Sequence, residues 1–409
     1  MNKLDYLFRT SRGNHDRYME RYRRRFNFSI NQETYSKKSM HDREKLLFQQ
    51  EITGYMRANK RRAFRGPVVL HMDFYPSRGN PPSIHQLAKN YLDLLWRPAT
   101  GLENLILPLK DDRQISILIV NYHIQKQNEI PRIEMQMAPL YDFYEDLRLV
   151  EAIRSGDGFP EDDDHSTYDY KEIFDEEDKD PFEQLDQIRE NLEGIEDLKD
   201  IIGLETFLNL KRMYLVQYQS NWFNLEKLKT FDLIHLFPND RISSNEFLDT
   251  ILEQHRNLII SHSFRPLRTA GLPTRMGDTE KFKATIRALL NEFRERYPSL
   301  FPLHINLNLT ILYVPPSGQE IDLDNLARYI VPLINEALKP PAGVWFAQNN
   351  HPRGFPTHTI IQYQIIKIPR KEHDPENGIV RLVFGEYEPF NNCWRNMDRI
   401  INSWSDAVF

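Results

Sequence analysis

The amino-acid sequence predicts an α+β fold in which one set of elements occurs twice. Apolar side chains alternate in the run Leu303–Val314 and dominate the run Val68–Tyr75, as is typical of strands. A helix-like segment precedes each run, and a loop containing Pro and Gly and then a second helix follow it. Repetition of this order at such a long interval indicates duplication and fusion rather than a short-repeat solenoid.

Each set comprises a helix, a strand, a second helix and two further strands. In the first set these are Asp42–Lys60, Val68–Tyr75, Ser83–Leu95, Ile115–Ile124 and Pro131–Met137. In the second set they are Thr279–Tyr297, Leu303–Val314, Leu326–Leu338, Thr359–Ile368 and Gly378–Phe384. We expect the last two strands of the second set to form a hairpin.

Acidic residues stand at a loop in each set. Asp322 and Asp324 open the second helix of the later set, a place that tolerates negative charge because it is a helix N-terminus. Together they could hold a divalent metal. The ordinary alternative is that Asp322 caps the helix and Asp324 is a first-turn acid. In the first set, a polar turn would by itself explain Asp111-Asp112.

A longer motif surrounds the later acids. It consists of Asp322-Leu323-Asp324-Asn325, the basic Arg328, Gly343 and Trp345 in a Gly-x-Trp, and the strand Tyr363–Lys367. This motif resembles the RusA family of Holliday-junction resolvases, which implies small, dimeric, magnesium-dependent α+β modules. The family pattern has two Asp before a helix, a Lys one turn later, an Asp pair after the Gly-x-Trp and a Lys on the next strand. The resemblance covers residues 26–140 and 258–388, so we expect an intrachain pseudo-dimer of two RusA-like modules.

Each half holds only part of that pattern. The second half keeps Asp322, Asp324 and Lys367, but has Arg328 at the position of the Lys and Ala347-Gln348 at the Asp pair. Arg is not a faithful substitute if that residue must also deliver a proton.

The first half departs in the opposite way. Ser83 and His85 stand at the two Asp positions, whereas Lys89 and Asp111-Asp112 match the Lys and the Asp pair. Lys126 is the candidate for the strand Lys. Outside the pattern, His85 would be an ordinary hydrogen-bonded loop histidine and Lys89 a solvated helix residue.

The incomplete halves leave three alternatives open. Asp322 and Asp324 could meet Asp111-Asp112 and Lys89 across the interface between the halves and form a composite site. The chain could instead be a scaffold that keeps the fold and its DNA surface without cleavage. This second alternative is favoured because each site of a symmetric dimer normally uses the acids of its own subunit. The third alternative is a single site in the second half, completed by another acid such as Glu320.

Phosphodiester hydrolysis explains why these residue types matter. One or two Mg²⁺ (or Mn²⁺) ions held by clustered carboxylates activate a water and neutralise charge on the phosphoryl and leaving oxygens. Nearby cations stabilise the same charge. The expected metal ligands are Asp322, Asp324, Asp111 and Asp112, and the expected catalytic cations are Lys89, Arg328 and Lys367.

Charge is distributed unevenly along the chain, whose net charge is −6. Residues 1–140 carry 24 Lys and Arg against 14 Asp and Glu, whereas residues 141–200 carry 6 against 23. An ordinary solvated helix face would explain the basic part, but its clusters also suit phosphate contacts. The candidate nucleic-acid-binding residues are Arg21, Arg23, Arg24, Arg25, Lys60, Arg61, Arg62 and Arg65.

Composition limits the remaining functions. Cys393 is the single cysteine, which excludes a disulfide framework and a cysteine-based zinc site and indicates a reducing compartment. The sequence lacks a signal-peptide core and an apolar run of membrane-spanning length. We therefore expect a cytoplasmic protein with no membrane partner.

Five parts are expected along the chain. They are a basic segment with the first module (1–140), an acidic disordered linker (141–183), a helical insertion (184–257), the second module (258–388) and a C-terminal docking helix (389–409). The linker could recruit a protein partner. We expect a protein that binds branched DNA, either as a Mg²⁺-dependent endonuclease or as an inactive DNA-binding or protein-interaction scaffold derived from a resolvase.

Overall fold

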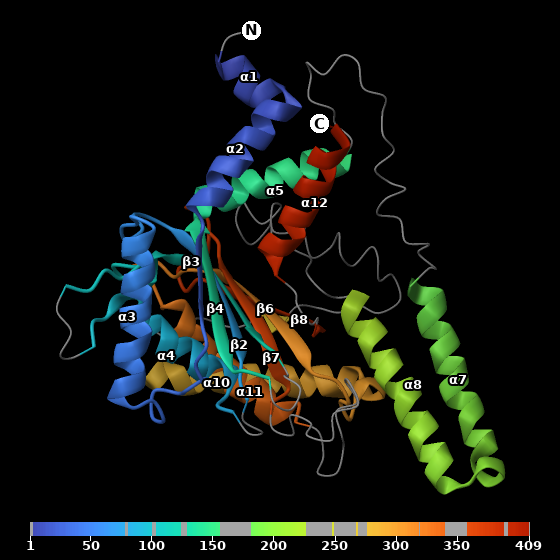
Figure 1. Ribbon diagram of the computed structural model, residues 1–409. Coiled ribbons are helices and arrows are strands. Elements are labelled where there is room, and N and C mark those ends of the chain that lie inside the picture. The colour runs from blue at the N-terminus through green and yellow to red at the C-terminus, as the bar shows by residue number, and fades with distance from the viewer. Residues whose placement is uncertain are drawn as a thin grey trace.

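The computed structural model of the chain has a mixed eight-stranded sheet covered by helices, in agreement with the predicted mixture of α and β elements (Figure 1). The strand order is β1-β4-β2-β3-β7-β6-β8-β5. The structure describes residues 3–77, 81–99, 104–123, 129–155, 181–225, 248, 267–268, 276–318, 320–339, 358–387 and 392–408.

The N-terminal part supplies the first four strands of that order. The strands are β1 (Phe26–Ile30), β2 (Val68–Tyr75), β3 (Ile115–Tyr122) and β4 (Arg132–Pro139). The helices are α1 (Lys3–Arg9), α2 (Ser11–Arg24), α3 (Asp42–Ala58), α4 (Ile84–Trp96) and α5 (Leu140–Ser155). Strand β2 is parallel to β3 and antiparallel to β4, and β4 is antiparallel to β1.

The C-terminal part repeats this arrangement. Its strands are β5 (Leu267–Arg268), β6 (Leu307–Val314), β7 (Ile360–Lys367) and β8 (Ile379–Glu386), and its helices are α10 (Met276–Arg296), α11 (Leu323–Ala337) and α12 (Cys393–Val408). Strand β6 is parallel to β7 and antiparallel to β8, and β8 is antiparallel to β5. The predicted hairpin of the last two strands is wrong, because β6 lies between β7 and β8 and pairs with both.

The two halves meet where β3 pairs with β7. These strands are antiparallel, and their paired residues run from Ile117 with Ile366 to Asn121 with Gln362. The central pair joins the fifth residue of β3, Ile119, to the fifth residue of β7, Gln364. The pairing is therefore symmetric about its centre, and one continuous sheet joins both halves.

Helices cover both faces of the sheet (Figure 1). On one face α3, α4, α10 and α11 enclose the larger apolar core. On the other face α2, α5 and α12 pack together, and buried Tyr18, Phe143 and Trp394 represent these three helices in a second core. The C-terminal segment thus forms a helix that packs on α5 and α2, where the sequence analysis places a docking helix.

Helix α5 corrects the expected course of the acidic segment. Residues 141–155, assigned to a disordered linker, belong to a helix whose Phe143, Leu147, Val150 and Ile153 are buried. These four apolar residues recur every three or four positions and lie on one face. Burial of this face stabilises the helix despite the surrounding acids.

Two helices between the halves form a separate hairpin. Helices α7 (Pro181–Ile202) and α8 (Leu204–Leu225) contact each other along their length, and Gly203, with a φ of 79°, provides the turn (Figure 1). Trp222 and Phe223 are buried at the base of α8. Most of the remainder of the predicted insertion, residues 226–257, lies outside the described residues.

Among the helices that the structure describes, none is long and apolar enough to cross a membrane.

A buried polar network lies beside the meeting of the halves. Asp73 Oδ1 accepts hydrogen bonds from Asn121 Nδ2 (2.9 Å) and His123 Nε2 (2.7 Å), and it lies 3.3 Å from His71 Nε2. Gln362 Nε2 donates to Asn121 Oδ1 across the strand pair (2.7 Å). Burial opposes the charge on His71, but the Asp73 carboxylate outweighs it and raises the pKa of His71 to about 10. A buried ion pair therefore supports the sheet where the halves join.

Candidate metal centre

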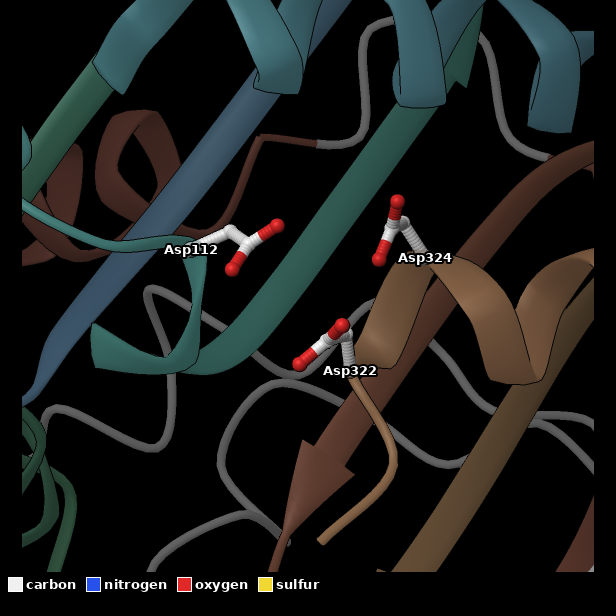
Figure 2. Close-up of side chains that lie close together, drawn as sticks. All are labelled: Asp112, Asp322 and Asp324. Atoms are coloured by element: carbon white, nitrogen blue, oxygen red, sulfur yellow. The ribbon is translucent and has the colours of Figure 1, made fainter. Parts of the chain in front are cut away.

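Carboxylates from both halves converge at the N-terminus of α11. Asp322 is the N-cap of α11, Asp324 lies in its first turn, and Asp112 begins the short 3₁₀ turn that leads into β3. One carboxylate oxygen from each lies within 4.8 Å of the other two. Figure 2 shows the three side chains facing a common space. The structure thus places Asp112 with Asp322 and Asp324, which is the arrangement of the composite alternative.

Helix capping does not account for Asp322. Although it holds the N-cap position with extended backbone angles, its side chain makes no capping hydrogen bond. Its Oδ2 instead accepts a hydrogen bond from Asn325 Nδ2 at 3.1 Å. Asn325, three residues along the same helix face, orients this carboxylate toward the other two acids. The i, i+3 spacing is the sequence signal that could have identified Asn325 as a supporting residue.

Asp111 has a different role from its neighbour Asp112. Its Oδ1 accepts a hydrogen bond from the backbone N–H of Arg113 at 2.9 Å, and its Oδ2 lies 2.8 Å from Arg113 Nη2. It therefore caps the 3₁₀ turn and forms an ion pair, as the turn interpretation predicts. Asp111 is not one of the three clustered acids.

Lys89 brings a positive charge to the centre. Its Nζ lies 2.5 Å from Asp324 Oδ2 and 3.5 Å from Asp93 Oδ1. Burial acts to lower the pKa of Lys89, but the hydrogen bond and charge of Asp324 outweigh it and raise that pKa. Because Asp324 is only 2% exposed, the ammonium compensates a carboxylate that water barely reaches.

The pKa values of Asp112 and Asp322 are raised because these acids are partly buried and lie close to other acids. Burial, followed by the charge of Asp322, raises the pKa of Asp112 from its ordinary value of 3.8 to about 6. Burial and the charge of Asp324 also raise the pKa of Asp322. A divalent cation would relieve this repulsion, and an all-oxygen donor set suits Mg²⁺ or Mn²⁺. The residues present therefore fit the expected ion.

Lys367 connects the two loops that carry the acids. Its Nζ lies 3.1 Å from Glu320 Oε2 and donates to the carbonyl oxygen of Arg113 at 3.4 Å. Glu320 precedes Asp322, and Arg113 follows Asp112. Lys367 thus positions the two loops, and Glu320 serves as its partner rather than as a member of the acidic cluster.

Several residues of the family pattern are placed differently or are not described. The eighth residue of β3, equivalent to Lys367 of β7, is Tyr122. The candidate Lys126 lies outside the described residues, as do Gly343, Trp345 and Ala347-Gln348. Arg328 is exposed, and its Nη1 lies 3.4 Å from Asn325 Oδ1, outside the acidic cluster.

Tyr363 is a neighbour of the centre that the sequence analysis treats only as part of a strand. Its side chain is fully buried on β7. Burial, with a contribution from the Asp324 charge, raises the pKa of its hydroxyl well above the ordinary value. The Tyr363 hydroxyl therefore stays neutral near the acids.

The predicted nucleic-acid-binding arginines divide into buried and exposed groups. Arg21 Nε lies 2.7 Å from Asp146 Oδ1, and Arg25 pairs with both Asp146 (2.9 Å) and Asp398 (2.7 Å). Arg21 and Arg25 are only 6% and 3% exposed, and these pairs join α2, α5 and α12. Their guanidinium groups are committed to the fold, which corrects their assignment to phosphate binding.

Arg61 is also committed to the fold. Its Nη1 and Nη2 donate to the backbone carbonyls of Arg24 and Arg25, each at 2.5 Å. The exposed members of the predicted set are Arg23, Arg24, Lys60, Arg62 and Arg65. Arg23, Arg24, Arg61 and Arg62 line a cleft of about 400 Å³ between α2 and the end of α3. This cleft retains the positive charge that phosphate contacts require.

Comparisons of this chain with models of known protein families, with curated proteins and with solved structures find no match.

Proposed function

We propose that this protein is a Mg²⁺- or Mn²⁺-dependent endonuclease that acts on branched DNA, with Asp112, Asp322 and Asp324 as its metal ligands. The observation that carries the proposal is the convergence of these three carboxylates from distant parts of the chain. Burial and then the charge of Asp322 raise the pKa of Asp112, so clustering of these acids by chance is unfavourable. Such unfavourable electrostatics are typical of functional sites.

The residues around the metal would divide the work. A bound divalent ion would activate water and stabilise negative charge on the phosphoryl group. Asn325 orients the Asp322 carboxylate, and Lys367 holds the two loops in register. Lys89, beside Asp324, is placed to stabilise charge on the phosphoryl or leaving oxygen.

The reaction is a hydrolysis. The oxygen of a water molecule forms a bond to phosphorus, and the bond from phosphorus to one sugar oxygen breaks. That sugar oxygen leaves with a proton, which the Lys89 ammonium can supply. The attacking water releases a proton to solvent, and Lys89 takes up a proton from solvent again. The products are a phosphate monoester and a free hydroxyl at a strand break.

The preference for branched DNA rests on the doubled architecture and the resemblance to RusA-like modules. Two halves with the same strand pairing, joined symmetrically through β3 and β7, would present two related surfaces to two DNA arms. The Arg-lined cleft offers a phosphate-binding surface in the first half. The chain is accordingly proposed as an intrachain pseudo-dimer of two RusA-like modules.

A DNA-binding scaffold is the second candidate. The contact between Lys89 and Asp324 favours it, because an ammonium at 2.5 Å neutralises one carboxylate without any metal. In that case the acidic cluster would be a residual feature of a fold that binds branched DNA and a protein partner without cutting.

Cleavage of labelled DNA separates the two candidates. Four-way junction, flap and linear duplex are incubated with Mg²⁺ or Mn²⁺ and with wild-type protein, Asp112→Asn, Asp111→Asn or the double variant Asp322→Asn/Asp324→Asn. Junction cleavage that is lost in Asp112→Asn and in the double variant but kept in Asp111→Asn supports the nuclease. Tight junction binding without cleavage by any version supports the scaffold.

A further inference from the structure

The N-terminus of α4 is the counterpart of the metal centre in the first half. Ser83 is the N-cap of α4 as Asp322 is of α11, and each lies the same number of residues after the start of β2 or β6. His85 consequently occupies the position of Asp324, and Lys89 that of Arg328. At this counterpart position the two carboxylates are replaced by a hydroxyl and an imidazole.

A cationic cleft opens in front of this counterpart. Its volume is about 470 Å³, and it is lined by Ser36, Lys37, Lys38, His85, Gln86, Lys89 and Arg328. Four of these side chains are basic and none is acidic. Lys38 and Arg328 are exposed at the cleft, whereas Lys37 and Lys89 also contact Asp93. Because Lys89 also contacts Asp324, the cleft adjoins the metal centre.

His85 provides a second, independent indication of a ligand. The side chain is only 7% exposed, and its Nδ1 has no hydrogen-bond partner among the described residues. Burial, with the nearby His358 and Arg328 charges, lowers the pKa of His85 to about 4, so the imidazole is neutral and one of its ring nitrogens can donate. A buried polar atom without a partner is costly unless a ligand satisfies it.

The chemistry of this cleft fits a phosphate group. The N-terminus of α4, a helix of 13 residues, favours an anion, and the Arg328 guanidinium can bind two phosphate oxygens at once. A metal ion is disfavoured, because the lining carries four cations and no carboxylate. A DNA strand bound at the metal centre would find this cleft next to it, across Lys89.

We propose that this cleft binds a phosphodiester group of DNA and does not cut it, so that the protein nicks one strand per binding event. The inference rests on the proposed endonuclease function and specifies its product. Of the two equivalent positions, the one at α11 would hydrolyse a strand, and the one at α4 would hold a phosphate. A symmetric pair of cutting centres would instead break two strands.

Binding without metal tests the phosphate contact. Affinity for a four-way junction is measured by fluorescence anisotropy in EDTA at several NaCl concentrations, for wild type, Lys38→Ala and Arg328→Ala. The matched control is Arg395→Ala, which removes an exposed arginine from α12 on the opposite face of the sheet. Loss of one phosphate contact should lower the slope of log Kd against log salt by about 1 in each cleft variant. Slopes for Arg328→Ala and Lys38→Ala that equal the slope for Arg395→Ala would overturn the assignment.

Inorganic phosphate distinguishes a DNA strand from a free anion. It is added to the wild-type complex at an ionic strength matched with NaCl. Stronger displacement of DNA by phosphate than by NaCl, absent in Arg328→Ala, supports a strand site, because the anion then competes with a DNA phosphate for the cleft. Phosphate that raises the Tm of the DNA-free protein but displaces no more DNA than NaCl does would mean that the cleft takes the free anion.

Plasmid cleavage then tests the product. Mn²⁺ is added to wild-type protein with supercoiled plasmid, and open-circular DNA should accumulate before any linear DNA. Linear DNA that forms as early as open circles would reveal two cutting centres and refute the inference while supporting the nuclease. Absence of all cleavage would refute the nuclease and the nicking, and the metal-free slopes would still show whether the cleft binds DNA.

Discussion

Replacing Asp112 by Asn should weaken the binding of Mn²⁺ far more than the same replacement at Asp111. The two residues are adjacent and carry the same charge, but only Asp112 has a carboxylate oxygen within 4.8 Å of those of Asp322 and Asp324. Asp111 is occupied by Arg113, and an Asn at that position can still cap the 3₁₀ turn. Both substitutions remove one negative charge, but only Asp112→Asn removes it from the acidic cluster. Comparing them therefore shows whether the position of the carboxylate matters.

The magnitude follows from the distances. Two unit charges at 4.8 Å repel by about 1 kcal/mol in water and by about 3.5 kcal/mol at an effective dielectric constant of about 20. We take the lower figure, because Asp112 remains partly accessible to solvent, which screens its charge. An ion bound among the three acids carries twice the charge and lies closer to Asp112 than the acids lie to one another, so losing this ligand should cost at least about 2 kcal/mol, or roughly 30-fold in Kd.

The sign of the pH dependence is also determined. Because the pKa of Asp112 is raised to about 6 in the folded protein, the metal-free fold loses stability as pH rises from about 4 to about 6. Above pH 6 metal-free Asp112→Asn should therefore be more stable than wild type by about 1 kcal/mol, and the two should converge below pH 4. Mn²⁺ affinity of the wild type should rise through pH 6 as the proton leaves.

Calorimetric titration with Mn²⁺ at pH 5 and pH 8 measures the affinity for the ion. Thermal unfolding in the presence and absence of Mn²⁺ measures the stability. Equal Mn²⁺ affinities for Asp112→Asn and Asp111→Asn would show that the clustered acids are not the binding site. Equal stabilities of metal-free wild type and Asp112→Asn at pH 8 would show that the acids do not repel each other as their distances require.

Four further substitutions test other parts of the structure. Lys367→Met should weaken Mn²⁺ binding about 10-fold by releasing the loops that carry the acids, with unchanged circular dichroism; an unaltered Kd would remove its positioning role. Arg62→Ala should lower the slope of log Kd for DNA against log salt by about 1 without changing Tm. Arg61→Ala should instead lower the free energy of unfolding in urea by about 1–3 kcal/mol, because the backbone carbonyls that it contacts lose their donors. The reverse pattern would contradict the division into an exposed and a structural arginine. Asp73→Asn should cost about 3–5 kcal/mol in urea unfolding at pH 7, because it leaves a buried imidazolium unpaired. Since the pKa of His71 is raised from 6.5 to about 10, that loss should shrink as pH rises from about 6.5 to about 10 and reach its minimum above pH 10, and a loss independent of pH would argue against the ion pair.

Local signals in the sequence anticipate most of the elements. The strand at Val68–Tyr75 has the same bounds in the sequence analysis and the structure, because its apolar run ends at proline and glycine. Register between strands is not local, and the hairpin expected from β7 and β8 is therefore replaced by pairing of both with β6. From the sequence, residues 141–155 are assigned to a disordered linker because they are part of an acidic segment. Their apolar residues lie on one face only when they are placed at helical spacing, as in α5.

Local sequence patterns also predict only part of the acidic cluster. Asp322 and Asp324 are two residues apart at a helix start, so their proximity follows from the sequence. Asp112 joins them only through the β3–β7 pairing, which no local pattern specifies. Likewise, composition groups Arg61 with Arg62, but the backbone carbonyls that occupy Arg61 are known only from the fold.

The single sheet that runs through both halves has a consequence for protein concentration. Where a centre draws on two separate subunits, dilution separates its parts, and activity per molecule falls below the dissociation constant of the dimer. Here the strand that follows Asp112 and the strand that follows α11 pair within one chain, so their encounter is a first-order event. For the proposed nuclease, metal affinity and specific activity should accordingly stay constant as the protein is diluted, and a cell could hold very few copies of this protein without losing assembled centres.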